Sequence, residues 1–143
     1  ALAFKDRLHL FGSISLAASE AFSLKNLNRD RAGQIEAMRK QTAAHIAGGV
    51  PVTRIGLQAA FGCNYAGDVA PAQVLAAITD GLAIAAEAGV RIRDLTLADT
   101  MGWANPRQIE NVIGEVRNRW PELRLALHLQ RVETDTYFHA PYA

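Results

Sequence analysis

The sequence contains a single cysteine, Cys63, and this scarcity excludes a scaffold held together by disulfide bonds. No combination of cysteine and histidine has the spacing of a zinc finger. No apolar run approaches the roughly 18 residues that a transmembrane helix needs. A basic segment followed by an apolar segment and a cleavage site is also lacking at the start. We therefore expect no secretory signal, no membrane contact and a cytoplasmic location.

An excess of charge of one sign is lacking as well. The 143 residues include 15 basic and 14 acidic side chains, for a formal net charge of +1. This balance gives no electrostatic reason to expect a nucleic-acid partner. Apolar residues make up 50% of the chain, a fraction that excludes intrinsic disorder at such low net charge. The length fits one globular domain.

Segments with a strand-like pattern alternate with segments of helical spacing along the whole sequence. Alternation of this kind predicts an α/β fold, a parallel sheet whose strands are connected by crossover helices, in the order β-α-β-α-β-α-β. We expect strands over residues 8–15, 52–60, 92–98 and 123–129. Helices are expected to begin near residues 30, 71 and 106, and polar loops to cover residues 19–28, 61–68 and 99–104.

Glycine and proline mark the boundaries of these helices. Gly48 and Gly49 end the first, because glycine accepts the left-handed conformation that a helix C-terminus often needs. Pro71 suits the first turn of the second helix, where its missing N–H would be unpaired anyway. Asn105 and Pro106 are typical of a helix start, with an asparagine cap followed by proline at the first helical position.

Polar or reactive residues follow every predicted strand. The carboxyl ends of parallel strands lie at one edge of the sheet, which is where such folds place their active sites. These residues therefore predict a candidate active-site edge. The alternative is that the loops are polar because they are solvated. The residues are Ser19, Glu20, Cys63, Asn64, Tyr65, Asp99, Thr100, His128 and Gln130.

His128 is the most informative single residue. Because strand side chains alternate, Ala126, His128 and Gln130 share the face opposite the neighbouring leucines, and that face should point to the interior or to a ligand. Side chains two positions apart on one strand could hold a metal from one side, although an amide oxygen is a weak ligand. The alternative is a histidine that is only hydrogen-bonded.

Four further residues allow a functional and a structural interpretation. Asp99, at a strand exit, could bind metal, hold a substrate hydroxyl or orient a base, or it could accept loop N–H groups. Cys63 lies in a glycine-flanked loop whose N–H groups could lower its pKa, or it is a small apolar filler. Asn26 and Asn28 could donate to a carboxylate or phosphate, or they form turns.

Four segments resemble 3-hydroxy-3-methylglutaryl-CoA lyases, in the order in which that family has them. Residues 18–28 (ASEAFSLKNLN) resemble Ser-Glu-x-Phe-x-x-Lys-Asn-x-Asn, and residues 61–69 (FGCNYAGDV) resemble Gly-Cys-Pro-Tyr-x-Gly, with Asn64 in place of proline. Residues 97–102 (LADTMG) resemble Leu-Gly-Asp-Thr-Ile-Gly. Residues 125–128 (LALH) are similar to the strand that carries the family's His-x-His metal pair.

The resemblance implies that residues 1–130 form part of a TIM (β/α)₈ barrel, with a divergent tail at 131–143. It implies cleavage of a carbon–carbon bond in a 3-hydroxyacyl-CoA thioester to acetyl-CoA and a keto acid, with Mg²⁺ or Mn²⁺. By this resemblance Asp99 and Cys63 are catalytic, and His128 and Gln130 lie at the metal. It also implies substrate contacts for Glu20, Asn26, Asn28 and Thr100.

Gln130 stands where the family has its second metal histidine, and the strands that carry the other metal ligands have no counterpart in this sequence. One imidazole and one amide suit Mg²⁺ poorly, because it prefers several oxygen ligands. Two alternatives to the lyase therefore stay open, a catalytically inactive truncated or degenerate barrel and another metal-dependent aldol or Claisen-type barrel enzyme. The two unpaired edges of a four-stranded sheet also predict that the chain is either a homo-oligomer or poorly folded by itself.

Overall fold

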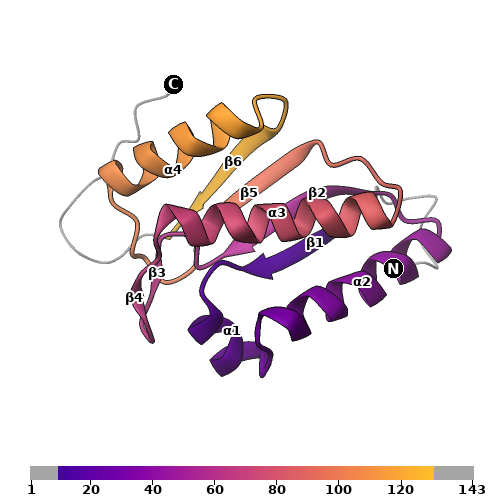
Figure 1. Ribbon diagram of the computed structural model, residues 1–143, viewed down its shortest axis with the longest axis horizontal. Coiled ribbons are helices and arrows are strands. Elements are labelled where there is room, and N and C mark those ends of the chain that lie inside the picture. Colours follow the sequence, from indigo (N-terminus) through magenta and orange to yellow (C-terminus); the bar gives the residue numbers. More distant parts are fainter. Residues whose placement is uncertain (1–9, 131–143) are drawn as a thin grey trace.

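In the computed structural model, which describes residues 10–130, four parallel strands form one sheet in the order β1-β2-β5-β6 (Figure 1). The predicted alternation of strands and crossover helices is confirmed. The strands are β1 (Gly12–Ala17), β2 (Val52–Gln58), β5 (Asp94–Asp99) and β6 (Arg124–Leu129). The helices between them are α2 (Arg31–Ala47), α3 (Pro71–Glu87) and α4 (Pro106–Arg119). Within residues 10–130, no helix is long and apolar enough to cross a membrane.

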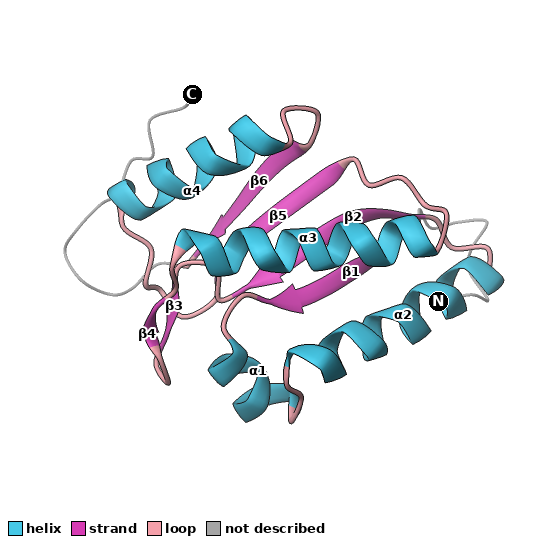
Figure 2. Ribbon diagram, in the orientation of Figure 1, coloured by secondary structure: helices cyan, strands magenta, loops and turns pink. Residues whose placement is uncertain are grey.

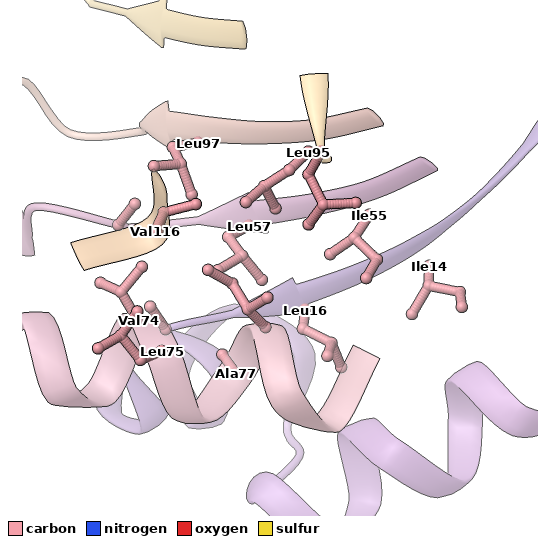
Figure 3. Packing of buried hydrophobic residues seen from close by; sticks show 14 of the residues in the cluster. Ile14, Leu16, Ile55, Leu57, Val74, Leu75, Ala77, Leu95, Leu97 and Val116 are labelled. Atoms are coloured by element: carbon pink, nitrogen blue, oxygen red, sulfur yellow. The ribbon is translucent and has the colours of Figure 1, made fainter. Parts of the chain in front are cut away.

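Helices α2, α3 and α4 lie on the same side of the sheet (Figure 2). The strand side chains beneath them are aliphatic and almost fully buried, and register sets them side by side across three strands (Figure 3). Full burial of such a side chain stabilises the fold by about 1.5–3 kcal/mol. One row of this core face consists of Ile14, Ile55 and Leu95, and the next of Leu16, Leu57 and Leu97.

The other face of the sheet carries small and polar side chains, and we call it the polar face. Its residues alternate along each strand with those of the core. On β6, Leu125 and Leu127 pack against the core, whereas Ala126 and His128 are exposed, which confirms the predicted orientation of this strand. The polar face includes Ser15, Gly56, Gln58, Thr96, Ala98, Ala126 and His128, and a charged row of Arg54, Asp94 and Arg124 at the amino ends of the strands.

The prediction of a polar loop over residues 19–28 is wrong, because this segment contains the helix α1 (Glu20–Leu27). Ser19 caps the helix and accepts the Phe22 N–H at 3.3 Å. Asn28 ends it in the left-handed conformation, with φ of 51°. Since only Phe22 and Ser23 of this short helix are buried, it lacks the apolar period that reveals a helix in sequence. The predicted loop at 61–68 also contains a small hairpin of β3 (Gly62–Cys63) and β4 (Gly67–Asp68).

The predicted boundaries of the three long helices are confirmed to within a residue or two. Asp30 caps α2, Pro71 opens α3, and Asn105 and Pro106 begin α4. Gly49, with φ of 69°, follows the end of α2 in the left-handed region that favours glycine.

Replacing Asp30 by alanine is expected to lower the free energy of unfolding by about 1 kcal/mol, because an N-cap is lost. The Asp30 carboxylate accepts the Gly33 N–H at 2.7 Å. Asp30→Asn retains an accepting oxygen and serves as the matched control, so it should stay close to the parent. Urea denaturation measures both variants, and equal stability of Asp30→Ala and Asp30→Asn would contradict this role.

The expectation of two bare sheet edges is corrected at β1. Side chains of α2 accept N–H groups from the outer edge of this strand. Gln34 Oε1 accepts the Ala17 N–H at 2.7 Å, and Met38 Sδ accepts the Ser15 N–H at 3.3 Å. The sequence pattern could not reveal this cover, because it depends on where α2 packs after the chain has turned back.

Candidate functional site

The carboxyl ends of the four parallel strands lie at one edge of the sheet, as the sequence predicts. Figure 1 shows α1 and the β3–β4 hairpin gathered at this edge, beside the arrowheads of β1 and β2. The loop between β5 and α4 begins at the same edge, since it follows the end of β5. Side chains from all four units can therefore contribute to one site.

Two exposed polar side chains end the polar face at this edge. His128 of β6 lies beside Ala98 of β5 in the sheet register. Gln58 ends β2 directly after Leu57, and the register partner of Leu57 is Leu97, which precedes Ala98. Gln58 and His128 therefore flank a small residue, Ala98, on the polar face. An imidazole can accept or donate a proton, and a carboxamide can both donate and accept a hydrogen bond.

Gln58 has no role in the sequence analysis. The signal that could have found it is the alternation on β2, where Ile55 and Leu57 point to the core and Gly56 and Gln58 to the opposite face. A polar residue at the carboxyl end of a strand, on the face opposite the core, is a candidate site residue by the same argument that selects His128.

The described residues contain no cluster of the acidic, histidine and cysteine side chains that most often bind metals. Within residues 10–130, no group of three or more histidine, cysteine, aspartate or glutamate side chains could hold a metal ion. His128 and Gln130 are both exposed and supply only one imidazole nitrogen and one amide oxygen. Mg²⁺ requires near-octahedral coordination, mainly by oxygen, and this pair does not approach it.

Asp99 is directed away from the polar face. It shares the core face of β5 with Leu95 and Leu97, and only 2% of it is exposed. Its Oδ1 accepts the Trp103 N–H at 2.7 Å, and its backbone carbonyl accepts the Gly102 N–H at 3.3 Å. In this structure the carboxylate shapes the loop that leaves β5, which is the structural alternative considered for it.

Thr100 joins the exits of two neighbouring strands. Its Oγ1 accepts the Ala59 N–H at 2.9 Å. Ala59 has φ of 50°, a left-handed conformation that is unfavourable for a residue with a side chain. Thr100 therefore helps to hold the sharp turn directly after Gln58.

Cys63 is fully buried and lies against Ser19, with 3.0 Å between Sγ and Oγ. Desolvation raises the pKa of this thiol. Hydrogen bonds from the Ser19 hydroxyl and from backbone N–H groups outweigh that effect and hold the pKa below its ordinary value. The pair connects the exit of β1 to the β3–β4 hairpin. The N–H groups that contribute are those of Tyr65, Ala66 and Phe22.

The lowered pKa of Cys63 predicts a pH-dependent contribution to stability. The folded protein loses the thiol proton at a lower pH than the unfolded chain, whose thiol pKa is about 8.5. Raising the pH through the interval between the folded and the unfolded pKa of Cys63 therefore favours the folded state. This contribution to stability is lost as the pH falls through the folded pKa. Cys63→Ala should cost more unfolding free energy near pH ~9 than near pH ~6 in urea denaturation. An equal cost at both pH values would contradict the shift.

Three predicted substrate contacts lie on or next to α1, and all three are exposed: Glu20, Asn26 and Asn28. Glu20 Oε1 accepts the Arg31 N–H at 3.1 Å. Asn26 Nδ2 donates to the Phe22 carbonyl at 3.0 Å, and Asn28 caps the helix C-terminus. The hydrogen bonds of this segment are local, so the structure places these residues at the rim and does not join them to His128.

Trp103 is a rim residue that the sequence analysis did not consider. Its indole Nε1 donates to Asn64 Oδ1 at 2.8 Å, and the Asn64 N–H donates to Met101 Sδ at 3.2 Å. A proline at position 64 would lack that N–H. A Cβ on Gly62 would lie 2.8 Å from Trp103, so glycine permits this close approach. The hairpin and the loop after β5 are thereby joined.

The chain is similar in sequence to two curated lyases, and no protein-family model matches it. It is 34% identical over 115 residues to the hydroxymethylglutaryl-CoA lyase YngG of Bacillus subtilis, covering 80% of this chain and 36% of that protein. It is 29% identical over 125 residues to the (R)-citramalyl-CoA lyase of Chloroflexus aurantiacus, covering 87% of this chain and 37% of that protein.

Solved structures of the same kind of enzyme share this fold. The HMG-CoA lyase of Bacillus subtilis matches 82% of this chain with a TM-score of 0.70 and 28% identity. The HMG-CoA lyase of Brucella melitensis matches 82% with a TM-score of 0.69 and 26% identity. The chain covers 37% and 39% of those two structures. The expected architecture, part of a TIM barrel, is thus confirmed.

Proposed function

We propose that this protein, which is similar to a hydroxymethylglutaryl-CoA lyase over 80% of its length, takes part in cleaving a carbon–carbon bond of a 3-hydroxyacyl-CoA thioester. The observation that carries the proposal is the exposed imidazole of His128 at the carboxyl end of a parallel strand, in a chain with this similarity. This edge is where barrel enzymes place their reacting groups.

The cleavage needs a base at the tertiary hydroxyl of the substrate. We assign that position to His128, whose imidazole would take the hydroxyl proton. As the hydroxyl oxygen forms the new carbonyl, the electron pair of the carbon–carbon bond passes to the thioester and generates the enolate of acetyl-CoA. The Gln58 amide can donate a hydrogen bond to the oxygen on which this negative charge develops. A proton returned to the enolate carbon completes acetyl-CoA.

The buried residues of the edge have a positioning role in this proposal. Asp99 and Cys63 are at most 2% exposed and bind loop groups, so they would act by holding the loops in place around the substrate. Thr100 does the same at the exit of β2. Glu20, Asn26 and Asn28 are exposed at the rim of the carboxyl edge. The role proposed for them is contact with the part of the thioester that lies away from the reacting carbon atoms.

The test is release of acetyl-CoA by the full chain, incubated separately with 3-hydroxy-3-methylglutaryl-CoA and with (R)-citramalyl-CoA. Parallel reactions contain Mn²⁺, Mg²⁺ or EDTA, because the resemblance implies a divalent cation. Faster release from one thioester identifies the preferred acyl group. Absence of release from both, under all three conditions, would overturn the proposal.

A second candidate function, a non-catalytic barrel segment, is favoured by one observation. The part of the chain that the structure describes offers no group of three metal-binding side chains. Titration with Mn²⁺, followed by its electron paramagnetic resonance signal, separates the two candidates. A chain that releases acetyl-CoA only with Mn²⁺ and binds the ion is a lyase, whereas one that does neither supports the second candidate.

We also infer that the chain self-associates through β6. This strand pairs with β5 on one side, and no other strand among residues 10–130 pairs with its outer edge. Leu129, which is 40% exposed, adds apolar surface at its end. Exposed strand edges favour pairing with another chain. Sedimentation velocity should detect an oligomer, and a monodisperse monomer would contradict the inference.

A further inference from the structure

The chain has two methionines, and the sulfur of each accepts a backbone N–H group from a distant segment. Met38 Sδ accepts the Ser15 N–H at 3.3 Å, and Met101 Sδ accepts the Asn64 N–H at 3.2 Å. The two side chains differ in exposure. Met38 belongs to the main core cluster and is 9% exposed, whereas Met101 lies in the loop after β5 and is half-buried. An oxidant in solution therefore reaches Met101 more easily than Met38.

Met101 is a point at which two loops of the carboxyl edge meet. Its sulfur holds Asn64 at the tip of the β3–β4 hairpin, and Asn64 Oδ1 accepts the indole N–H of Trp103 at 2.8 Å. The same side chain also packs against a small buried cluster. The cluster consists of Ala17, Phe22, Ala59 and Cys63. The hydrogen bond and the apolar contact both depend on an unoxidised thioether.

A peroxide oxidises a thioether in a two-electron step. With hydrogen peroxide, the sulfur lone pair attacks one peroxide oxygen, the O–O bond breaks, and the other oxygen leaves as water. The product, methionine sulfoxide, is polar and chiral. A sulfoxide oxygen held against an apolar cluster loses its hydration, which costs free energy. The oxidised side chain is therefore expected to leave the cluster, and the Asn64 N–H then loses its acceptor.

We propose that Met101 is a site of reversible oxidation by peroxides, and that methionine sulfoxide at this position releases the hairpin tip, residues 64–66, from the loop after β5. A methionine sulfoxide reductase reverses the step. Two thiols of its reductant supply two electrons and two protons, the sulfoxide oxygen leaves as water, and the thiols form a disulfide. This inference is independent of the proposed function, because it uses only the contacts between the two loops.

The release is confined to the hairpin tip, because other contacts between the same loops do not involve sulfur. Gln108 Nε2 donates to Asp68 Oδ1 at 3.1 Å, which holds the base of the hairpin to the start of α4. Thr100 Oγ1 accepts the Ala59 N–H at 2.9 Å, which holds the exits of β2 and β5 together. Oxidation of Met101 should therefore leave the far-ultraviolet circular dichroism spectrum unchanged.

The first measurement is peptide mass spectrometry of the full chain after treatment with hydrogen peroxide. Met101 is expected to gain an oxygen atom about tenfold faster than Met38, because a buried thioether reacts only when the structure opens locally. The thiol of Cys63, which is fully buried, should stay unmodified over the same period. Equal rates at the two methionines would overturn the assignment of the site.

The second measurement follows the indole that Asn64 holds. Trp120→Phe leaves Trp103 as the single tryptophan, so the fluorescence of this variant reports on the hairpin tip. Peroxide should shift the emission to longer wavelength, as the indole becomes more hydrated. Methionine sulfoxide reductase with dithiothreitol should restore the original emission. If circular dichroism shows that Trp120→Phe is not folded, the same comparison is made with the parent chain.

Three variants assign the fluorescence shift to one sulfur. Met101→Leu keeps an apolar side chain that peroxide cannot oxidise, so treatment should no longer shift the emission. Met38→Leu is the matched control and should keep the shift. Met101→Gln introduces a polar side chain of similar length and should show the shifted emission before any treatment. A peroxide shift that persists in Met101→Leu, or parent-like emission of Met101→Gln, would overturn the proposal.

Discussion

Replacing His128 by alanine is expected to lower the rate of acetyl-CoA release by at least about a hundredfold, the usual loss when a general base is removed. His128 is an exposed side chain at the end of β6, on the polar face. Removing it therefore leaves the core intact, so stability should change little. Steady-state kinetics with the preferred thioester measures the effect, which should fall on kcat.

Two further variants make this prediction specific. His128→Gln keeps a side chain that can form hydrogen bonds, but an amide cannot take up a proton at neutral pH. This variant should therefore be as inactive as His128→Ala. Lys40→Ala changes an exposed side chain of α2 that is not part of the candidate site. This variant should keep the parent rate. If His128→Ala keeps more than about one tenth of the parent rate, His128 is not the base.

Replacing Leu57 by alanine is expected to lower the free energy of unfolding by about 3 kcal/mol, the middle of the range for leucine truncation in a core. Leu57 is 1% exposed and lies between Leu16 and Leu97 in the sheet register. The cavity left by the truncation cannot fill easily, because both neighbours are themselves fixed in strands. Urea denaturation followed by circular dichroism measures the change.

The matched control is a leucine at the surface. Leu24 of α1 is 48% exposed, so Leu24→Ala removes little buried area and should change stability by less than about 0.5 kcal/mol. The contrast between the two leucines tests whether the interface between the sheet and α3 is the core of the fold. Similar losses for Leu57→Ala and Leu24→Ala would contradict this assignment.

The fold was predictable where burial imposes a period on the sequence. Ile55, Leu57, Leu95 and Leu97 alternate with smaller or polar residues because only one face of each strand meets the helices. Cap residues such as Asp30 and Asn105 act within one turn, so their signal is local and survives in the sequence. Helix α1 was missed for the opposite reason, since it buries few residues.

The candidate site was predictable only in part. Alternation on β6 oriented His128 correctly, because that argument uses neighbours within one strand. The same alternation on β5 places Asp99 with Leu95 and Leu97, but its position at the strand exit drew attention to its chemistry rather than its face. Whether Asp99, Cys63 and the residues of α1 act on a substrate stays a prediction.

By itself, the sequence determined the order of the four sheet strands and the three long helices between them, the parallel sheet and the edge at which polar residues gather. These properties follow from local periodicity and from the rule that parallel strands share an orientation. The tertiary structure alone decided that α2 covers the edge of β1, that Ser19 meets Cys63, and that Asn64 meets Met101. These contacts join residues at least 17 positions apart. No local pattern encodes which distant side chain will satisfy a given polar group once the chain has folded.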